Sequence, residues 1–556
     1  MLRRLPCLAA IGALVAALSL VSGASAHPGK AGHGLAPKAG GTLVFGSEQE
    51  PPCMNLNLND CNNTWANYYA QLVIRGVYVV NPKFVYTNDL VSKVSLQLKP
   101  QRVTYYIRPD AKWNDGKPVT AQDFVFTLQT IMNAAWDSKP TGGGIVSRNG
   151  YDQISSSKVF NKNKAVTFTY KANFADWKDL FGYVLPQHSL AGEDFSKVFI
   201  NDINDPKTGK PISDGPFLFQ GWNHGSDMTL VKNPAFYGHK AKLDKIVARF
   251  LTNSNSEIQA VRGGEVDAIY PQPQLPLADL KSVSGLSVQS HLGPIYEHID
   301  IQVGPHGNPL AKFPWVRQAL MMSIDRASLV KAVFATLNPS LTPLGNVIYL
   351  NNQPEYIDHF KRWNYNAAKA KQLIESHGCT KGGDGIYSCK GTRLSFQFES
   401  TAGNQLRVLA FSVIQQQLKA AGIEVINNFK PSNIYFGADL PNGNTELAMF
   451  AWSGGVDPSP NTSIWSCPSD GGTQNYMNYC NKAVDAWFKK GNAELNPATR
   501  TKYYNQADAL IARDLPTIPL YQKPTFLVQH SYVHGMTDNT TQAGPMWNAE
   551  DWTISK

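Results

Sequence analysis

A run of 25 residues, Thr104–Leu128, places the signals for a strand, a tight turn and a capped helix directly one after another. Thr104–Ile107 is β-branched and aromatic, which suits a pleated strand. Asn114–Gly116 is typical of a turn, because glycine adopts positive φ at no steric cost. Thr120 suits a helix N-cap, and Asp123 follows three residues later to complete a capping box. Apolar side chains then recur at helical spacing: Phe124, Val125, Leu128 and Ile131.

Helices and strands alternate further along the chain. Gln405–Ala421 carries one apolar face, and Gly422 is expected to end this helix in a left-handed cap before a strand begins at Ile423. Asn496–Pro497 suits the N-cap and first turn of a helix that reaches Arg513. Such alternation predicts α/β lobes. A mature chain of about 530 residues exceeds the size of a single core, so two or three domains are expected.

The first 26 residues are typical of an export signal. The basic pair Arg3-Arg4 precedes the uncharged apolar stretch Leu8–Val21, and Ala24–Ala26 is a small-residue cleavage site. The apolar stretch is shorter than the about 20 residues that span a membrane, although a retained anchor is the alternative. Cys7 lies before this stretch, so no lipid anchor is expected. We expect cleavage after Ala26 and a periplasmic or cell-surface, extracellular location.

The cysteines fit an oxidising compartment. Six remain after the signal peptide, an even number that favours disulfides in an exported protein. They fall into three pairs that are local in sequence, and we expect these pairs to be bonded: Cys53–Cys61, Cys379–Cys389 and Cys467–Cys480. The alternative is a metal site, but no pair has the C-x-x-C spacing typical of zinc. No metal and no cofactor are therefore expected.

The charge and the motif content exclude two broad classes of function. The chain has 51 basic and 42 acidic residues, a mild excess that is spread along the sequence without a dense basic block. This distribution does not favour nucleic acid as a partner. No G-x-S-x-G, H-E-x-x-H or G-x-x-x-x-G-K-[S/T] pattern is present, which argues against the commonest hydrolase and nucleotide-binding chemistries.

The string around the first segment carries a more specific signal than its periodicity. Arg108, Trp113, Asp115–Pro118, Thr120–Ala121 and Asp123 form a combination that no short catalytic motif shares. This block resembles the extracytoplasmic solute-binding proteins of peptide/nickel-type ABC importers, the family 5 proteins that include oligopeptide- and dipeptide-binding members. Further fragments resemble the same family in the same order: Glu48–Pro52, Leu185–His188, Asp214–Phe217, Lys232–Tyr237, Val261–Asp267, Val316–Arg326, Asn366–Leu373, Gln415–Val425 and Asp514–Tyr521.

The resemblance implies a bilobal periplasmic-binding-protein fold of type II, cluster C, an α/β fold with an extra subdomain on the first lobe and the ligand enclosed between the lobes. The signal peptide, 1–26, and a disordered lead-in, 27–39, precede the folded part. The expected division of the folded part is lobe I at 40–60, 205–290 and the C-terminal return 520–556, the extra subdomain at 61–204, and lobe II at 291–519.

The segment Glu446–Asp457 (ELAMFAWSGGVD) is where the resemblance places the ligand. In many peptide-binding relatives this place has the pattern W-x-A-D-Y-x-D/E-P, and its first Asp faces the free α-amino group of the peptide. A buried ammonium needs such an opposite charge. Here Trp452 matches the Trp, but Gly455 stands in the place of that Asp. The candidate ligand-binding residues of this segment are Trp452, Ser453, Gly454, Gly455 and Asp457.

Further residues are candidates to contact a ligand. Glu48 and Glu50 could supply the missing carboxylate, or could be solvated loop charges. Arg407 and Tyr435 could contact an anionic or flat ligand, although a surface position on a helix is the alternative for the arginine. The indole of Trp452 could stack on a ligand or belong to the core. Asp457 could bind a cation or cap the turn that follows it.

By this resemblance the protein is the substrate-binding component of an ABC importer and not an enzyme. It would capture an oligopeptide or a similar small solute between its lobes and deliver it to a permease and ATPase complex at the membrane, and we expect it to act as a monomer. The alternatives are a secreted hydrolase on the same scaffold, a binding protein for an opine, an oligosaccharide or a nickel chelate, and a receptor or chaperone.

Overall fold

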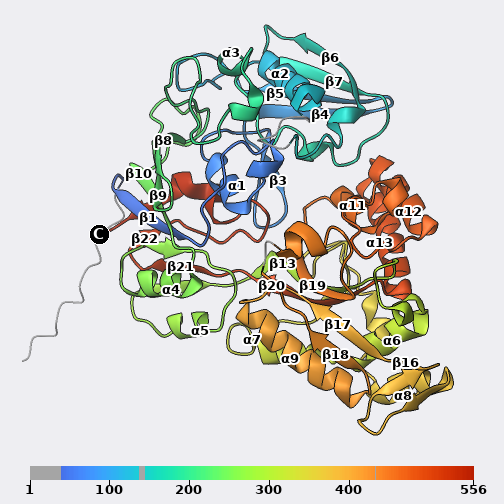
Figure 1. Cartoon of the computed structure of the whole chain (residues 1–556). Helices are drawn as coiled ribbons and strands as arrows, with labels where there is room; N and C mark the ends of the chain where they lie inside the picture. The colour runs from blue at the N-terminus through green and yellow to red at the C-terminus, as the bar shows by residue number, and fades with distance from the viewer. Residues whose placement is uncertain (1–38, 137–143, 432–433) are drawn as a thin grey trace, which may run out of the picture.

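Three β-sheets organise the chain in the computed structural model, which describes residues 39–136, 144–431 and 434–556 (Figure 1). The predicted signal peptide and nearly all of the predicted lead-in lie outside these residues. The seven-stranded sheet has the order β12 (Leu286–Gln289), β21 (Leu527–His530), β11 (Ala268–Ile269), β1 (Thr42–Ser47), β10 (Lys245–Phe250), β9 (Asp227–Lys232) and β8 (Phe217–Asn223).

The second large sheet has five strands in the order β18 (Glu424–Asn427), β17 (Ser395–Glu399), β19 (Leu447–Ser453), β13 (Leu292–Ile301) and β20 (Thr517–Pro524). The third sheet has the order β4 (Val91–Leu98), β5 (Gln101–Ile107), β7 (Ala165–Tyr170) and β6 (Ile154–Phe160). Smaller sheets consist of β2 (Tyr78–Val80) with β3 (Tyr86–Asn88), β22 (Val533–His534) with β23 (Thr553–Ile554), and β14 (Cys379–Lys381), β15 (Tyr387–Cys389) and β16 (Thr392–Arg393).

Helices flank these sheets. Those in the first half of the chain are α1 (Thr64–Ala70), α2 (Ala121–Met132), α3 (Gln187–Leu190), α4 (Ser254–Arg262) and α5 (Leu277–Leu280). Those that surround the five-stranded sheet are α6 (Pro314–Ser323), α7 (Arg326–Phe334), α8 (Ala367–Ser376), α9 (Gln405–Ala420), α11 (Thr462–Trp465), α12 (Lys482–Ala493) and α13 (Pro497–Asp514). Figure 1 shows α11–α13 between the five-stranded and the four-stranded sheets. The mixed α/β architecture agrees with the predicted fold class.

Two adjacent segments carry the chain between the large sheets. β12 leads through residues 290–291 into β13, and β20 leads through residues 525–526 back into β21. The segments are paired, because the Thr525 N–H donates to the His291 carbonyl oxygen at 2.8 Å. The predicted boundary between 519 and 520 falls inside β20, because this strand continues to pair with β13 as far as Pro524. The other predicted domain boundaries stay predictions.

Two extended cores hold the molecule together. One buried cluster joins the seven-stranded sheet to the four-stranded sheet, and includes Phe45 of β1, Tyr105 of β5 and Phe124 of α2. The other surrounds the five-stranded sheet and continues into α4, α5 and the strands β11 and β21 at the junction. The four-stranded part and the strands β1 and β8 to β10 of the seven-stranded sheet share the first core, so we treat them as one body that faces the five-stranded lobe.

The local predictions from caps and breakers are confirmed. The Asp123 carboxylate accepts hydrogen bonds from the backbone N–H and the hydroxyl of Thr120, at 2.7 and 3.1 Å, at the start of α2. Gly422 follows α9 with φ +85°, the left-handed conformation expected of a C-terminal cap. The Asn496 side chain accepts from the Thr499 N–H at the start of α13.

The three expected disulfides are present: Cys53–Cys61, Cys379–Cys389 and Cys467–Cys480. Each closes a short loop, and the second joins the antiparallel neighbours β14 and β15. Among the described residues, no helix is long and apolar enough to cross a membrane.

Candidate functional site

A cavity of about 140 Å³ lies where the two connecting segments meet the seven-stranded sheet. Its wall comes from both sides of the junction: the loop after β1 (Glu48, Gln49), α1 (Thr64, Trp65, Tyr68), the loop after β11 (Tyr270–Pro273), the start of β13 (Gly293–Ile295) and the end of β20 with the residue after it (Lys523–Thr525). The chain thus encloses space between its two bodies, as the bilobal prediction requires.

Aromatic rings form one side of the cavity. The Trp65 and Tyr68 rings meet edge to face with centroids 5.4 Å apart, and Tyr68 and Tyr270 do the same at 6.2 Å. Burial raises the pKa of both tyrosines, with the charges of neighbouring carboxylates adding to the effect, so their hydroxyls stay neutral. Rings of this kind bind the apolar part of a ligand and also attract a cation to their faces.

One carboxylate and one ammonium face the cavity. Glu48 accepts a hydrogen bond from the Gln272 N–H at 3.0 Å. Burial raises the pKa of Glu48, although hydrogen bonds from Gln272 and Trp65 and the charge of Lys523 oppose that shift. Lys523 donates to Glu297 at 2.6 Å, and burial lowers the pKa of its ammonium. The site therefore presents both signs of charge to a bound group.

A cluster of buried ion pairs holds the Lys523 side chain in place. Glu297 is fully buried and binds two cations, Lys523 and Arg407, the second at 2.8 Å. Although burial alone would raise the pKa of Glu297, the two cations lower it to about 2. Arg407 also donates to the Thr401 hydroxyl at 2.8 Å. The expectation of a surface arginine is wrong, because Arg407 lies on the buried side of α9 and its guanidinium is used inside the lobe.

The glycine-rich end of β19 lies beside the cavity. Ser453 pairs with Ile295 across the sheet, and the Gly454 N–H donates to the Pro294 carbonyl oxygen at 2.7 Å. Gln542, from the other body, donates to the Ser453 hydroxyl at 3.3 Å. The Gly455 carbonyl accepts from the Gln353 amide at 3.0 Å. The structure thus brings Ser453 and Gly454 to the rim of the site, beside Pro294 and Ile295 of its wall.

The two aromatic candidates lie elsewhere. Trp452 is half-buried and stacks on Tyr476, with centroids 5.8 Å apart and the planes 19° from parallel. Tyr435 is fully buried, and its hydroxyl donates to the Met449 carbonyl oxygen at 3.3 Å. These contacts place both rings in the packing of the five-stranded lobe rather than in the cavity wall.

The remaining two carboxylates are engaged away from the cavity. Glu50 accepts hydrogen bonds from the Trp222 indole at 2.8 Å and from the Gly225 N–H at 3.0 Å. Asp457 accepts from Tyr86 at 2.8 Å and from Arg500 at 3.2 Å. Of the carboxylates named from the sequence as substitutes for the missing ammonium anchor, only Glu48 lines the cavity.

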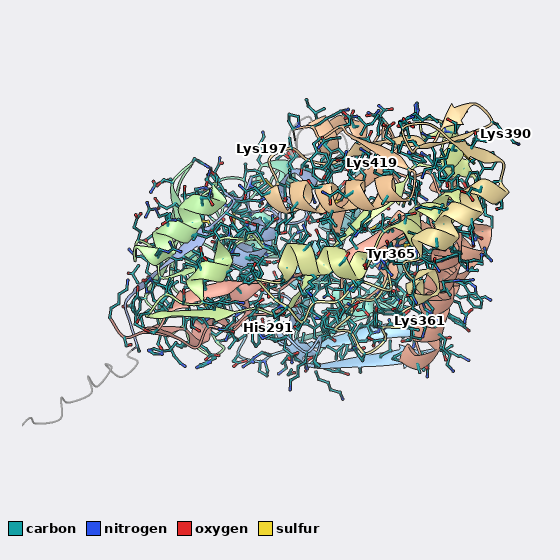
Figure 2. The ribbon with its side chains drawn as sticks, turned by 90° about the horizontal axis from the view of Figure 1, so that it is seen from below. Lys197, His291, Lys361, Tyr365, Lys390 and Lys419 are labelled. Carbon is teal, nitrogen blue, oxygen red and sulfur yellow. A yellow bond between two sulfur atoms is a disulfide. The ribbon has the colours of Figure 1, made fainter. Side chains whose placement is uncertain are left out.

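A second cavity of about 430 Å³ borders the connecting segments, and His291 and Asp538 are among the residues that line it. His291 lies at the outer surface (Figure 2). Its imidazole is 2.8 Å from Asp538, and that hydrogen bond raises the pKa of His291. Asp538 also accepts from the Tyr270 hydroxyl at 2.9 Å. This carboxylate therefore links the first cavity to the segments on which the two bodies would turn.

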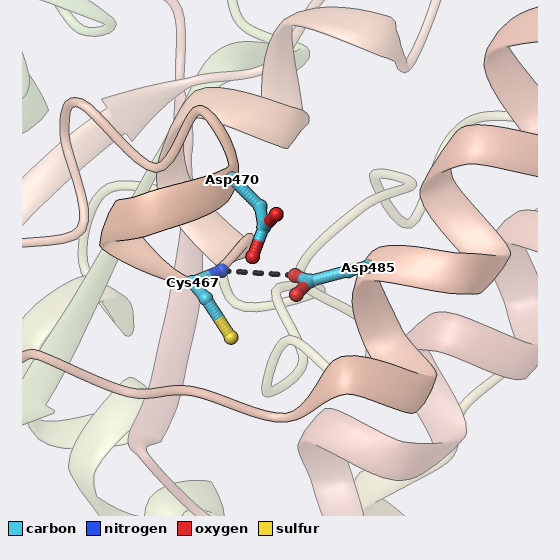
Figure 3. A group of neighbouring side chains, drawn as sticks. All are labelled: Cys467, Asp470 and Asp485. Carbon is cyan, nitrogen blue, oxygen red and sulfur yellow. Dashed lines mark hydrogen bonds between the residues drawn. The ribbon is translucent and has the colours of Figure 1, made fainter.

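One group of side chains has the spacing of a metal site: Cys467, Asp470 and Asp485 (Figure 3). The sulfur of Cys467 is bonded to Cys480, so it has no thiolate to offer a metal. The ammonium of Lys482 pairs with both carboxylates. A lysine thus occupies the place that a cation would take, and the group does not make a metal centre.

Sequence reasoning missed several residues of the cavity wall, namely Trp65, Tyr68, Tyr270, Gln272 and Lys523. Lys523 could have been found, because it lies two residues beyond the matched segment Asp514–Tyr521, on the strand face that continues from Tyr521. The aromatic residues carry no local signal, because Trp65 and Tyr68 of α1 meet Tyr270 only through the long-range pairing of β1 with β11.

Comparison with known proteins agrees with this architecture. The sequence profile described as "Bacterial extracellular solute-binding proteins, family 5 Middle" matches residues 86–475, more than half of the chain. The oligopeptide-binding protein AppA of Bacillus subtilis is 25% identical over 533 residues, which cover 94% of this chain and 93% of AppA.

Solved structures show the same fold. The periplasmic EDTA-binding protein EppA superposes with a TM-score of 0.84 at 24% identity, over 94% of this chain and 97% of EppA. AppA of Bacillus subtilis in complex with a nonapeptide superposes with a TM-score of 0.75 at 22% identity, over 94% of this chain and 100% of AppA. The predicted bilobal fold and the predicted family are both confirmed, and the chain belongs to the bacterial extracellular solute-binding proteins of family 5.

Proposed function

We propose that this protein is the solute-binding component of an ABC importer, and that it captures an oligopeptide or a similar small solute between its lobes and delivers it to a membrane permease and its ATPase. The observation that carries the proposal is the cavity of about 140 Å³ at the junction, which has walls from both bodies of the molecule. A site built in this way is complete only when the lobes are together, so a ligand that fills it stabilises the closed form.

The cavity has room for only one end of a peptide, and its chemistry favours the amino end. Glu48 supplies the negative charge that an ammonium needs when it leaves water. The faces of Trp65 and Tyr68 add cation–π attraction beside it. We propose that Glu48 takes the role of the carboxylate that is absent at Gly455. The rest of the ligand would then follow the rim at Ser453 and Gly454 by backbone hydrogen bonds, as extended peptides do.

The proposed role is binding without turnover. The lining of the cavity contains no histidine, serine or cysteine among its described residues, so it lacks the usual nucleophile and base of a hydrolase. Glu48 has no second carboxylate beside it in the wall, which argues against glycosidase chemistry. The relatives are solute-binding proteins and not enzymes, in agreement with this proposal.

A thermal-shift screen tests the proposal. The panel contains peptides with free and with acetylated amino ends, opines, oligosaccharides and metal chelates. A ligand at 100 times its dissociation constant adds about 2.7 kcal/mol to the free energy of unfolding, which gives a clear rise in Tm. We expect peptides with a free amino end to raise Tm and their acetylated forms to raise it less. If only chelates raise Tm, the peptide assignment is wrong; if nothing in the panel does, the binding role itself is contradicted.

A further inference from the structure

A charged contact joins the four-stranded part of the molecule to the five-stranded lobe. Five side chains form it, and we call them the clasp: Tyr86, Asp176 and Asp179 from the first part, and Asp457 and Arg500 from the lobe. Tyr86 begins β3, the two aspartates flank Trp177, and Arg500 lies in the first turns of α13. None of these residues lines the cavities described above.

The clasp is a continuous chain of hydrogen bonds. The Tyr86 hydroxyl is 2.5 Å from Asp179 and 2.8 Å from Asp457. One guanidinium nitrogen of Arg500 donates a hydrogen bond to Asp457 at 3.2 Å, and another donates to Asp176 at 3.0 Å. The Tyr86–Asp457 and Arg500–Asp176 hydrogen bonds each join one body of the molecule to the other.

Two backbone groups reinforce the contact. The Ser459 N–H of the lobe donates to Asp176 at 2.8 Å, and the Ala175 N–H donates to the Asn492 carbonyl oxygen at 2.8 Å. The four-stranded part shares its core with the seven-stranded sheet, whereas Asp457 and Arg500 belong to the loop after β19 and to α13 of the five-stranded lobe. Any opening of the lobes about the connecting segments that carries the two bodies apart must therefore break the clasp.

The charges of the clasp do not balance. Three carboxylates share one guanidinium, and Asp176 is fully buried while Asp457 is nearly so. A further cation near it is Lys178, whose ammonium lies over the Tyr86 ring at 5.3 Å. Tyr349 and Tyr504 face Arg500 from the lobe and carry no positive charge, and Glu355 adds a further negative charge near Tyr349.

Burial and this excess of negative charge favour the protonated form of Asp176. Burial, and then the charge of Asp457, raise the pKa of Asp176 to about 7. Asp179 lies at the exposed edge of the clasp, so Asp176 is the buried carboxyl group that titrates. When the lobes part, water reaches the Asp176 carboxyl group and its pKa returns towards the ordinary value of 3.8. The closed form therefore holds protons that the open form gives up.

We propose that the clasp is a proton-linked lock on the closed form, which takes up protons when the lobes close and releases them when the lobes part. The lock acts without a ligand, so it is independent of the function proposed above. Because the pKa of the Asp176 carboxyl group is higher in the closed form, closure is favoured in acid and loses that advantage as the pH rises towards 7. For one carboxyl group with the values given for Asp176, the closure equilibrium falls roughly 100-fold between pH 5 and pH 8.

Small-angle X-ray scattering of the full-length mature protein measures how far the lobes open. The samples contain no added ligand and have constant ionic strength. The radius of gyration is recorded from pH 5 to pH 8 for the wild type and for three variants. Asp457→Asn keeps the shape of the side chain but removes the charge that adds to burial in raising the pKa of Asp176. Tyr86→Phe removes a hydrogen-bond donor to Asp179 and Asp457. Asp110→Asn is the matched control, because Asp110 is exposed and pairs only with Arg108.

We expect the radius of gyration of the wild type and of D110N to increase with pH along the same curve. D457N should flatten this curve, and Y86F should give a more open molecule at pH 8 than the wild type. His291, whose pKa is raised by its hydrogen bond to Asp538, is unchanged in D457N, so a flattened curve assigns the response to the clasp. A wild-type radius that does not change with pH overturns the proposal. So does a D457N curve that coincides with that of the wild type.

Discussion

At the scale of single residues, the proposed anchor for a ligand is a carboxylate outside the segment that the resemblance points to. The glycine at 455 leaves the end of β19 without a charge, and a side chain there would also be crowded, because a Cβ on Gly455 would lie 3.1 Å from the Asp457 carbonyl oxygen. Glu48, from the opposite body, is the carboxylate that lines the cavity. We therefore propose that the carboxylate that binds the ammonium of the ligand comes from the loop after β1 and not from the end of β19.

The substitution Glu48→Gln tests this shift. A charged hydrogen bond contributes about 1.5–3 kcal/mol, so we expect the Kd for peptides with a free amino end to rise about 10- to 100-fold. The Kd for an acetylated peptide should change much less. Glu50→Gln is the matched control, because it makes the same change in the same loop at a residue outside the cavity. Equal effects of E48Q and E50Q in isothermal titration calorimetry would refute the assignment.

Arg407 shows how burial alters the meaning of a charged residue. Its removal in Arg407→Leu leaves Glu297 with Lys523 as its single cation, and breaking a buried pair in this way typically costs about 3–5 kcal/mol. Arg393→Leu is the control: Arg393 is exposed and pairs with Glu424, so its loss should cost at most about 1 kcal/mol. The midpoints of urea unfolding give both values. A cost for R407L as small as that for R393L would mean that the cluster is not a structural support of the site.

The sequence predicts residues of the site only where local pattern and chemistry coincide. Glu48 follows a strand and belongs to a loop with a family pattern, so it could be named. The environment of Arg407 could not be predicted, because Glu297 lies 110 residues away and reaches it only through the pairing of β13 in the sheet. The same limit applies to Tyr435, which the sequence suggests as a ligand contact but which is buried inside the five-stranded lobe.

At the scale of elements, helix ends were the most predictable features. The prediction that Gly422 ends α9 rests on conformational freedom alone, and its φ of +85° agrees with it. Packing adds a second constraint that the sequence does not reveal, because a Cβ on Gly422 would lie 2.5 Å from the Tyr387 ring.

Gly422→Ala separates these two constraints when it is compared with Gly403→Ala. Gly403 has nearly the same φ, +83°, but a Cβ there would meet nothing within 4 Å. We expect G403A to cost about 1–2 kcal/mol for the left-handed backbone. G422A should cost about 1–3 kcal/mol more, because the ring must shift. Chemical denaturation of the two variants measures the difference, and equal costs would show that the contact with Tyr387 is relieved without strain.

Element boundaries were less predictable where a strand continues past its motif. The motif that ends at Tyr521 lies within β20, which continues to Pro524 because β13 offers further backbone partners. A proline in the last position of this strand ends the pairing without loss, since proline has no N–H to donate. The strand length is therefore set by its neighbour and not by its own composition.

At the scale of the whole molecule, the family pattern predicts two lobes and an extra subdomain, but not the contact that holds them together. Tyr86, Asp176, Asp457 and Arg500 are separated by up to several hundred residues, and each has an ordinary role when it is considered alone. These side chains form their hydrogen bonds and ion pairs across the two bodies only when the lobes are in contact. The proton-linked lock proposed for them makes pH a variable that any binding measurement on this protein must hold constant.

Native mass spectrometry of the purified mature protein shows whether this chain encloses a small solute between its lobes. We expect a single bound species of about peptide mass, released on denaturation and identified as a molecule with a free amino group. The bound fraction should fall in E48Q and stay unchanged in E50Q. A protein that carries no small molecule, and acquires none from a pool of short peptides with free amino ends, would not be the solute-binding protein proposed here.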